Sequence, residues 1–249
     1  MRRRLTTVLG AVACTATLAL TNVTAANAAV TPAACLTVEA GSALAADCPH
    51  GLIKANDLLF IGDSFLALSR QIPADIEAHA RAIGTLGANE KYRDAAVSGT
   101  VISQISQAYS TEEAKSPVKV VVMDGIGNDM LRAGCATPSD SCAAITNAVA
   151  TTKTLFAKMA SDGTVQDVVW MWYPLVPNNA NLNALEQFIE PKIQALCAAS
   201  TVPCHWVPLA PVWAGHSDYS SDGLHPTAAG AQATADAVWA KMQADCVAQ

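Results

Sequence analysis

Short apolar runs recur along the chain, and most of them are followed by a segment with helical spacing. The runs end at glycine, proline or a polar residue and are almost wholly apolar, as is typical of strands covered on both faces. They lie at residues 58–61, 94–97, 118–123, 165–173 and 201–207. Strands that alternate with helices favour a parallel sheet with right-handed crossovers. We therefore predict an α/β fold, a three-layer α/β/α sandwich around a five-stranded parallel sheet.

The segments with helical spacing would cover the two faces of this sheet. One begins near Phe65, a second covers residues 73–86 and a third follows Pro138. Two more are expected at residues 182–199 and 226–247. Pro191 should kink or divide the first of these two, because proline lacks the backbone N–H that a helix interior requires.

The first 28 residues have the pattern of a secretory signal peptide. Three arginines open the chain, an uncharged apolar stretch runs over residues 5–20, and Ala26-Asn27-Ala28 forms a small-x-small cleavage site. A membrane anchor is the alternative, but threonines interrupt the apolar stretch and no second long apolar segment follows. We expect residues 1–28 to be removed, the protein to be secreted without an integral membrane segment, and residues 29–249 to form a single domain.

Charge and composition narrow the class of partner. Acidic residues outnumber basic ones by 21 to 15, and removal of the arginines at positions 2–4 would make the chain more acidic still. Nucleic-acid binding needs a basic face that neutralises phosphates, so we expect no nucleic-acid partner. With 51% hydrophobic and 14% charged residues, the chain can bury a core and is not disordered. A neutral or small substrate fits this composition.

Seven cysteines lie beyond the predicted cleavage site and would meet an oxidising compartment. Two local bonds are expected, Cys135 with Cys142 and Cys197 with Cys204, each stabilising its loop by about 2.5 kcal/mol on the chain-entropy model. Cys35 with Cys48 would tie down the N-terminal arm, which leaves Cys246 over. A different pairing that joins the two termini stays open. Zinc binding is the weaker interpretation, because no C-x-x-C pair occurs.

Chemically versatile residues follow the predicted strands. Ser64 comes after the first strand, Gly99 after the second, Asn128 after the third, and the last loop holds Asp222 and His225. In open parallel sheets the carboxyl ends of the strands meet at one rim, where ligands bind. A serine becomes a nucleophile when a histidine takes its proton, and a carboxylate can orient that histidine. Amide donors can then stabilise the negative oxygen that develops on the attacked carbonyl.

This order of Ser, Gly, Asn and Asp-x-x-His over residues 62–226 resembles the SGNH or GDSL hydrolase family. The resemblance implies a flavodoxin-like sheet and a metal-independent serine esterase or lipase without a cofactor. It makes Ser64 the nucleophile, His225 the base and Asp222 its orienting partner. It also makes Ser64, Gly99 and Asn128 the oxyanion donors.

The chain departs from the family pattern at two positions. Phe65 replaces the leucine of the GDSL block, and Ile126 stands where a glycine usually precedes the asparagine by two residues. Motifs of other enzyme classes are missing from the sequence. It contains no G-x-S-x-G elbow, no G-x-G-x-x-G after a strand and no phosphate-binding G-x-x-x-x-G-K-[ST] loop.

Other interpretations of the same residues remain. Taken singly, each motif residue is an ordinary cap or turn residue. The side chains of His216, Asp218, Asp222 and His225 could instead form a metal site. Trp206 and Trp213 could wall the substrate pocket, although packing is the commoner role of large aromatic residues.

The sequence thus predicts a secreted, monomeric serine esterase whose catalytic domain spans residues 29–249. It would hydrolyse short acyl or acetyl esters of small molecules or polysaccharides through an acyl-enzyme on Ser64. The alternatives are a lipase, phospholipase or polyester hydrolase of the same fold, and a noncatalytic glycan-binding module.

Overall fold

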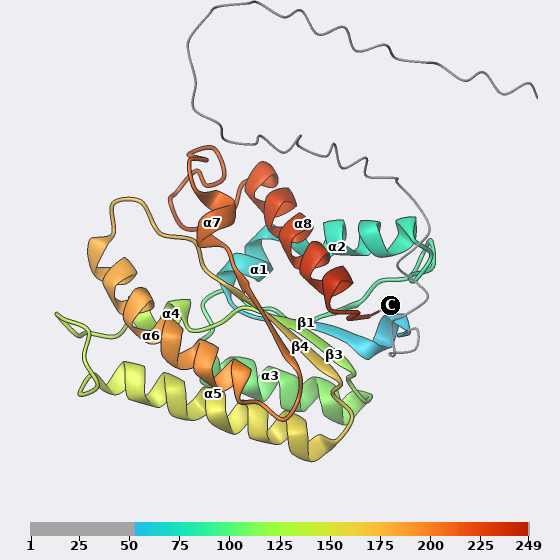
Figure 1. Cartoon of the computed structure of the whole chain (residues 1–249), viewed down its shortest axis with the longest axis horizontal. Coiled ribbons are helices and arrows are strands. Elements are labelled where there is room, and N and C mark those ends of the chain that lie inside the picture. The colour runs from blue at the N-terminus through green and yellow to red at the C-terminus, as the bar shows by residue number, and fades with distance from the viewer. Residues whose placement is uncertain (1–52, 249) are drawn as a thin grey trace, which may run out of the picture. The chain divides into compact units, whose positions relative to one another are not determined.

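The five predicted strands form one parallel sheet in the computed structural model, which describes residues 53–248. The strand order is β2-β1-β3-β4-β5, with β3 at the centre between β1 and β4 (Figure 1). Their bounds are Leu58–Ile61 for β1, Arg93–Asp94 for β2, Val120–Met123 for β3, Asp167–Trp172 for β4 and Cys204–Pro208 for β5. The predicted α/β sheet is confirmed, although β2 is shorter than expected and β5 begins later.

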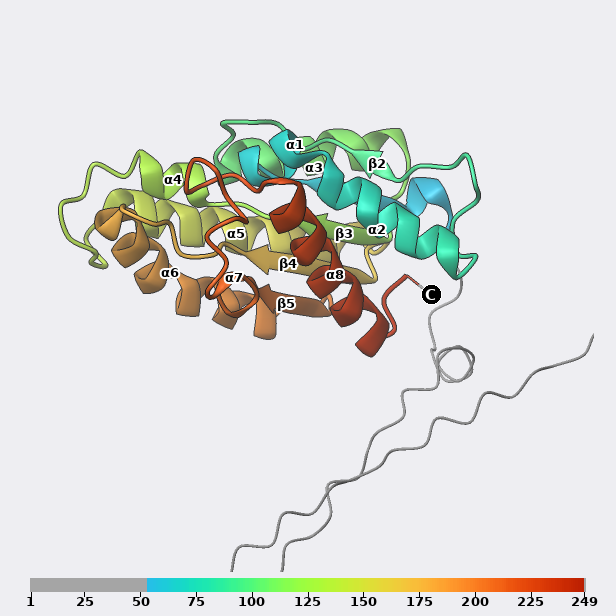
Figure 2. The ribbon, with the colours of Figure 1, turned by 90° about the horizontal axis from the view of Figure 1, so that it is seen from above.

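Helices cover both faces of the sheet and give the predicted three layers. On one face lie α3, α5 and α6, and on the other lie α1, α2 and α8, as Figures 1 and 2 show. A short 3-10 helix, η1, precedes β1. The bounds are Ala55–Asp57 for η1, Ser64–Ser69 for α1, Gln71–Ala82 for α2, Ile102–Lys115 for α3, Gly127–Leu131 for α4, Ala143–Asp162 for α5, Ala180–Ala198 for α6, Ala210–Trp213 for α7 and Ala228–Ala244 for α8.

Alternation along the strands explains why their runs are uniformly apolar. In β1, Leu59 and Ile61 pack into the core shared with α3, α5 and α6, whereas Leu58 and Phe60 pack toward α2 and α8. Successive strand side chains point to opposite faces, so a strand with helices on both sides needs apolar residues at every position. All residues of β1, β3 and β4 are accordingly buried.

Two helices differ from the sequence-based expectation. Helix α6 continues through Pro191, so the expected division there is wrong. Buried residues on both sides of the proline, Ile189 and Ile193, pack in the same core, and this burial outweighs the lost backbone hydrogen bond. Helix α3 occupies a segment to which the sequence analysis assigns no element. Its apolar face consists of Ile102, Ile105 and Tyr109 and is too sparse to stand out among polar neighbours.

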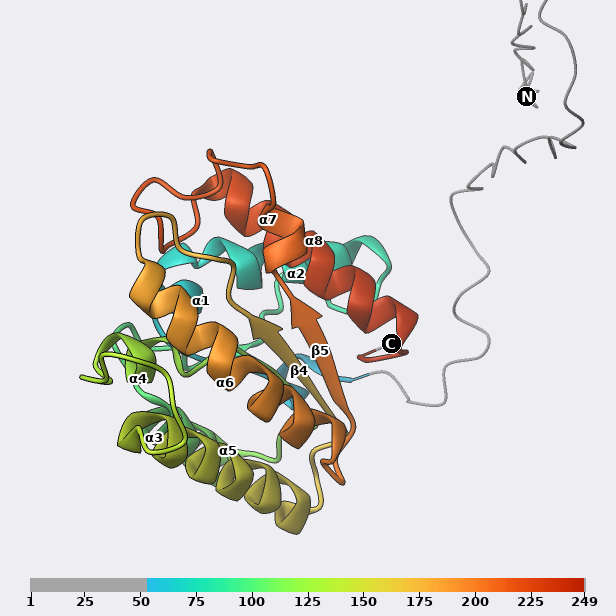
Figure 3. The same cartoon turned by 60° about the vertical axis from the view of Figure 1, so that its left-hand side comes forward.

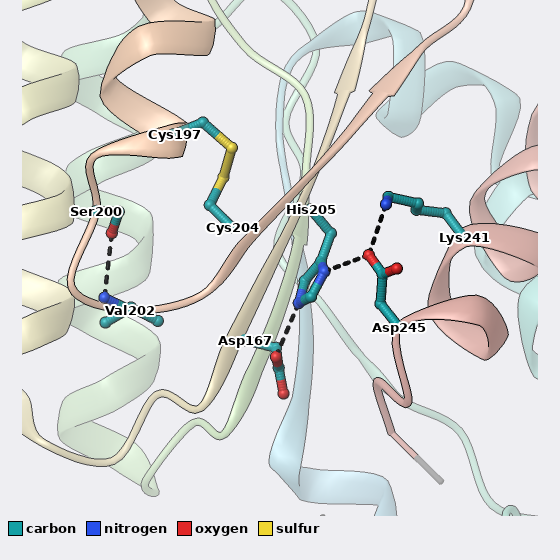
Figure 4. The surroundings of a disulfide bond; sticks show 8 residues. All are labelled: Asp167, Cys197, Ser200, Val202, Cys204, His205, Lys241 and Asp245. Carbon is teal, nitrogen blue, oxygen red and sulfur yellow. Dashed lines mark hydrogen bonds and ion pairs between the residues drawn. A yellow bond between two sulfur atoms is a disulfide. The ribbon is translucent and has the colours of Figure 1, made fainter. Parts of the chain in front are cut away.

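Both predicted local disulfides are present, Cys135 with Cys142 and Cys197 with Cys204. The second bond joins the end of α6 to the start of β5 (Figure 4). Cys246 also takes part in a disulfide bond, so it is not the left-over cysteine of the simplest pairing. The expected pair Cys35 and Cys48 and the predicted leader at residues 1–28 lie outside the described residues.

Within residues 53–248, none of the helices has the length and apolar character that a membrane span requires.

An ion network lies beside the Cys197–Cys204 bond, at the end of the sheet where β4 and β5 begin (Figure 4). His205 Nε2 lies 2.8 Å from Asp167 Oδ1, and His205 Nδ1 lies 2.6 Å from Asp245 Oδ2. Lys241 Nζ lies 2.7 Å from the same Asp245 oxygen. The network therefore ties β4 and β5 to the end of α8.

Candidate active site

Ser64 is the first residue of α1 and directly follows the tight turn that leaves β1. A buried carboxylate at the end of β3 holds this turn, since Asp124 accepts the N–H of Asp63 at 2.6 Å and the N–H of Leu66 at 3.0 Å. A side chain at position 62 would collide with that carboxylate, which explains Gly62. The turn thus presents the half-buried Ser64 at the carboxyl edge of the sheet.

A second buried carboxyl group lies behind the serine. Asp63 accepts the N–H of Phe65 at 3.1 Å and the hydroxyl of Tyr173 at 2.7 Å. The Tyr173 oxygen in turn accepts the N–H of Gly127 at 3.3 Å, so the ends of β1, β3 and β4 are linked. Burial raises the pKa of Asp63, and burial together with the nearby Asp63 raises the pKa of Asp124.

Neither Asp124 nor Tyr173 is among the residues that the sequence predicts to form the site. Both follow a strand directly, Asp124 after β3 and Tyr173 after β4. A place at the carboxyl end of a strand, which makes Ser64 and Asn128 candidates for the site, therefore also makes Asp124 and Tyr173 candidates. The signal that could have revealed them is a polar residue directly after an apolar run, even where no recognisable motif surrounds it.

The loop after β2 carries Gly99 and lies against the serine turn. The N–H of Val97 donates to the Gly62 carbonyl at 3.0 Å, and the Thr100 hydroxyl donates to the same oxygen at 3.1 Å. Gly99 has a φ of +81°, in the left-handed region that glycine adopts most readily. The Arg132 guanidinium donates a hydrogen bond to the Gly99 carbonyl oxygen at 2.9 Å. Gly99 itself does not line the cavity described below.

Asn128 lies in the short helix α4, which is separated from the end of β3 by three residues. Ile126 at the start of this helix has a φ of +89°, which is the left-handed region and a rare conformation for a β-branched residue. The backbone thus takes up at Ile126 the conformation that the family's glycine would adopt freely. Such a residue costs about 1–3 kcal/mol and persists when its surroundings fix it. Here the Ile126 side chain is 1% exposed within the core.

His225 and Asp222 form a close pair in the loop before α8. His225 Nδ1 lies 2.7 Å from Asp222 Oδ2, while the backbone N–H groups of Leu224 and His225 donate to Asp222 Oδ1 at 2.8 and 2.7 Å. Partial burial opposes ionisation of Asp222, but these hydrogen bonds prevail and hold its pKa well below the usual range. Asp222 is therefore a carboxylate, and Nδ1 carries the proton that it accepts.

A small cavity brings three of the predicted residues together, Ser64, Asn128 and His225. They come from the ends of β1 and β3 and from the last loop. His225 Nε2 is buried and has no hydrogen-bond partner in the described part of the chain, which leaves it free to act as a base. The Ser64 hydroxyl and His225 Nε2 line the same cavity but do not form a hydrogen bond with each other.

Trp206 and Trp213, which could have walled the substrate pocket, do not line the cavity. Trp206 stacks on Trp172 with ring centroids 5.3 Å apart, and Trp213 packs on Phe65 at 5.6 Å. Packing is therefore the role that the structure confirms for both. His216 stacks on Tyr219 at 4.2 Å, and residues 53–248 contain no group of three or more His, Cys, Asp and Glu side chains arranged to hold a metal ion.

Comparison with known proteins identifies the family. The family model described as GDSL-like Lipase/Acylhydrolase matches residues 58–238, and the chain belongs to that family. It is a carboxylic ester hydrolase, so the noncatalytic glycan-binding alternative is set aside. A search of curated proteins found no match to the chain.

Solved structures with low sequence identity share the fold. LAE5, an alpha/beta hydrolase enzyme from the metagenome of Lake Arreo, is 17% identical with a TM-score of 0.62, over 80% of this chain and 98% of that one. TesA is 21% identical with a TM-score of 0.59, over 74% and 97%. A variant of Axe2, an acetyl xylan esterase from Geobacillus stearothermophilus, is 14% identical with a TM-score of 0.61, over 77% and 96%.

Proposed function

We propose that the protein is a secreted serine esterase that hydrolyses short acyl or acetyl esters through an acyl-enzyme on Ser64. The observation that carries the proposal is the shared cavity of Ser64, Asn128 and His225, with the Asp222 carboxylate on one imidazole nitrogen and the other nitrogen unpartnered within the described residues. These are the parts that acyl transfer to a serine requires.

The proposed reaction has two halves that use the same groups. His225 Nε2 takes the proton of the Ser64 hydroxyl as its oxygen attacks the ester carbonyl, and the protonated imidazole then gives that proton to the departing alcohol. Asp222 stabilises the imidazolium. The N–H groups of Ser64 and Gly99 and the amide of Asn128 would stabilise the tetrahedral oxyanion. Water, activated by the same histidine, then releases the acid and restores the serine.

The size of the cavity supports a short acyl group. Its volume is about 10 Å³, roughly the space that one water molecule requires, so the enclosed part of the site suits a small group rather than a long acyl chain. The similarity to an acetyl xylan esterase adds an acetylated polysaccharide to the candidate substrates. The Cys135–Cys142 and Cys197–Cys204 bonds are compatible with the proposed secretion.

Kinetics on a series of p-nitrophenyl esters, from acetate to palmitate, would test this proposal. Ser64→Ala should lower kcat on acetate by at least about a thousandfold, because no other group replaces the nucleophile. The wild-type kcat/KM should be highest for the shortest acyl chains. Thermal unfolding of Ser64→Ala provides the control for correct folding.

Two results would count against the proposal in different ways. Turnover that survives in a folded Ser64→Ala variant would exclude Ser64 as the nucleophile. A kcat/KM that rises steadily toward palmitate would leave the nucleophile in place but favour the lipase alternative over the short-chain esterase.

A further inference from the structure

Glu186 is a carboxyl residue on the buried face of α6, and the proposed reaction does not use it. The other buried residues of α6 are Leu182, Leu185, Ile189, Ile193 and Cys197. Glu186 lies among them with only 4% of its surface exposed. A carboxyl group at a core position reduces stability unless a partner compensates for its lost hydration. Packing alone therefore does not explain a glutamate at this position.

Glu186 lines the same cavity as Ser64 and His225. Its helix packs against α4, which carries Asn128, and the N-terminal half of α6 therefore lies at the carboxyl end of the sheet (Figure 3). Within residues 53–248, its carboxyl group forms neither a hydrogen bond nor an ion pair with another side chain or with the backbone. The cavity that contains the proposed nucleophile is thus also lined by a carboxyl group that makes no hydrogen bond to the described part of the protein.

The surroundings of Glu186 favour its uncharged form. Burial, then the Asp63 carboxyl at the end of β1, then Glu190 on α6 itself raise the pKa of Glu186 to about 8. The titratable groups that line the cavity besides Glu186 are Asp63, Tyr173 and His225, and no lysine or arginine lines it. At neutral pH the side chain is therefore a carboxylic acid that can both donate and accept a hydrogen bond.

We propose that Glu186 hydrogen-bonds a hydroxyl group of the substrate next to the scissile ester, so that the enzyme favours hydroxylated esters. The inference rests on the proposed function, because it places the scissile ester at Ser64. A hydroxyl matches a carboxylic acid as both donor and acceptor. A bound ester would exclude water from the cavity, so a substrate without the hydroxyl would leave the acid without a hydrogen bond there, which carries an energetic penalty. The hydroxyl can belong to the acyl part or to the alcohol part of the ester.

Two matched pairs of esters distinguish these sources. p-Nitrophenyl butanoate and p-nitrophenyl 3-hydroxybutanoate differ in the acyl part, whereas ethyl acetate and 2-hydroxyethyl acetate differ in the alcohol part. The wild type should prefer the hydroxylated member of one pair by about tenfold in kcat/KM, as expected for one buried hydrogen bond. Glu186→Leu should abolish this preference. Glu186→Gln should keep most of it, because an amide also donates and accepts.

Glu190→Gln is the matched control. Glu190 lies one helical turn further along α6 and does not line the cavity. The proposal therefore expects this variant to keep the wild-type preference. A Glu190→Gln variant that lost the preference as fully as Glu186→Leu would overturn the assignment to Glu186.

The pH profile gives a readout that a purely structural carboxyl group would not change. As the pH rises through about 8, Glu186 ionises and places a negative charge beside the developing oxyanion, so the wild-type kcat/KM should fall. Glu186→Gln cannot ionise and should keep its kcat/KM over the same range.

Equal rates within both ester pairs, or a preference that survives in Glu186→Leu, would overturn this inference while hydrolysis itself persisted. Failure of the proposed function is distinguishable, because it would show as turnover in the folded Ser64→Ala variant.

Discussion

At the scale of single residues, the site includes a strained backbone conformation at a residue whose side chain is buried in the core. Ile126 adopts a left-handed φ of +89° and lies two residues before Asn128, which lines the cavity. The cost of that conformation is offset by burial of the isoleucine side chain in the core, where it is 1% exposed. The chain thus replaces the family's glycine with a residue that gains core packing and keeps the turn.

The proposed oxyanion role of Asn128 leads to a prediction at this scale. Asn128→Ala removes one donor for the tetrahedral oxyanion and should lower kcat on p-nitrophenyl acetate by roughly a hundredfold to a thousandfold. KM should change little, because the donor acts mainly in the transition state. Steady-state kinetics would measure both constants. A folded variant whose kcat falls less than about threefold would exclude Asn128 from this role.

At the scale of elements, the loops that follow the strands make the site, and the opposite end of the sheet carries a separate ion network. His205 in β5 lies between Asp167 of β4 and Asp245 after α8. The hydrogen bond to Asp167 raises the pKa of His205, partial burial opposes this, and Asp245 raises the pKa further. The protonated histidine is therefore favoured in the folded state and stabilises it.

His205→Gln should therefore destabilise the protein in a pH-dependent way. The folded-state pKa of His205 is raised, so its stabilisation is fully present below the unfolded value of about 6.5 and is lost as the pH rises through the folded value. The variant should lower Tm more at about pH 6 than at about pH 9. His79→Gln removes the more exposed His79–Asp236 pair and serves as the matched control. An equal loss of Tm at both pH values would contradict the account.

At the scale of the whole molecule, the alternation of apolar runs and helical segments was sufficient to predict the sheet, its parallel pairing and the rim where the site lies. That Ser64, which follows the first strand, and His225, which lies in the last loop, line one cavity could be predicted with it. Asp124, Tyr173 and Glu186 could not, because Asp124 and Tyr173 follow a strand without any motif and Glu186 lies among both polar and apolar residues of a helix. Their roles depend on which distant groups the fold brings near them, and spacing along one chain does not contain that information.

Active-site labelling would show whether Ser64 and His225 act as one catalytic unit. We propose that the Ser64 hydroxyl and the His225 imidazole work together although they lie in the first and last loops of the sheet. The protein and its His225→Ala variant would be treated with an organophosphonate ester and mapped by peptide mass spectrometry. The account predicts one phosphonate on Ser64 in the wild type and labelling slower by at least about a hundredfold in the variant, since the serine then lacks its base. Labelling at another residue, or an equal rate in the folded His225→Ala variant, would contradict it.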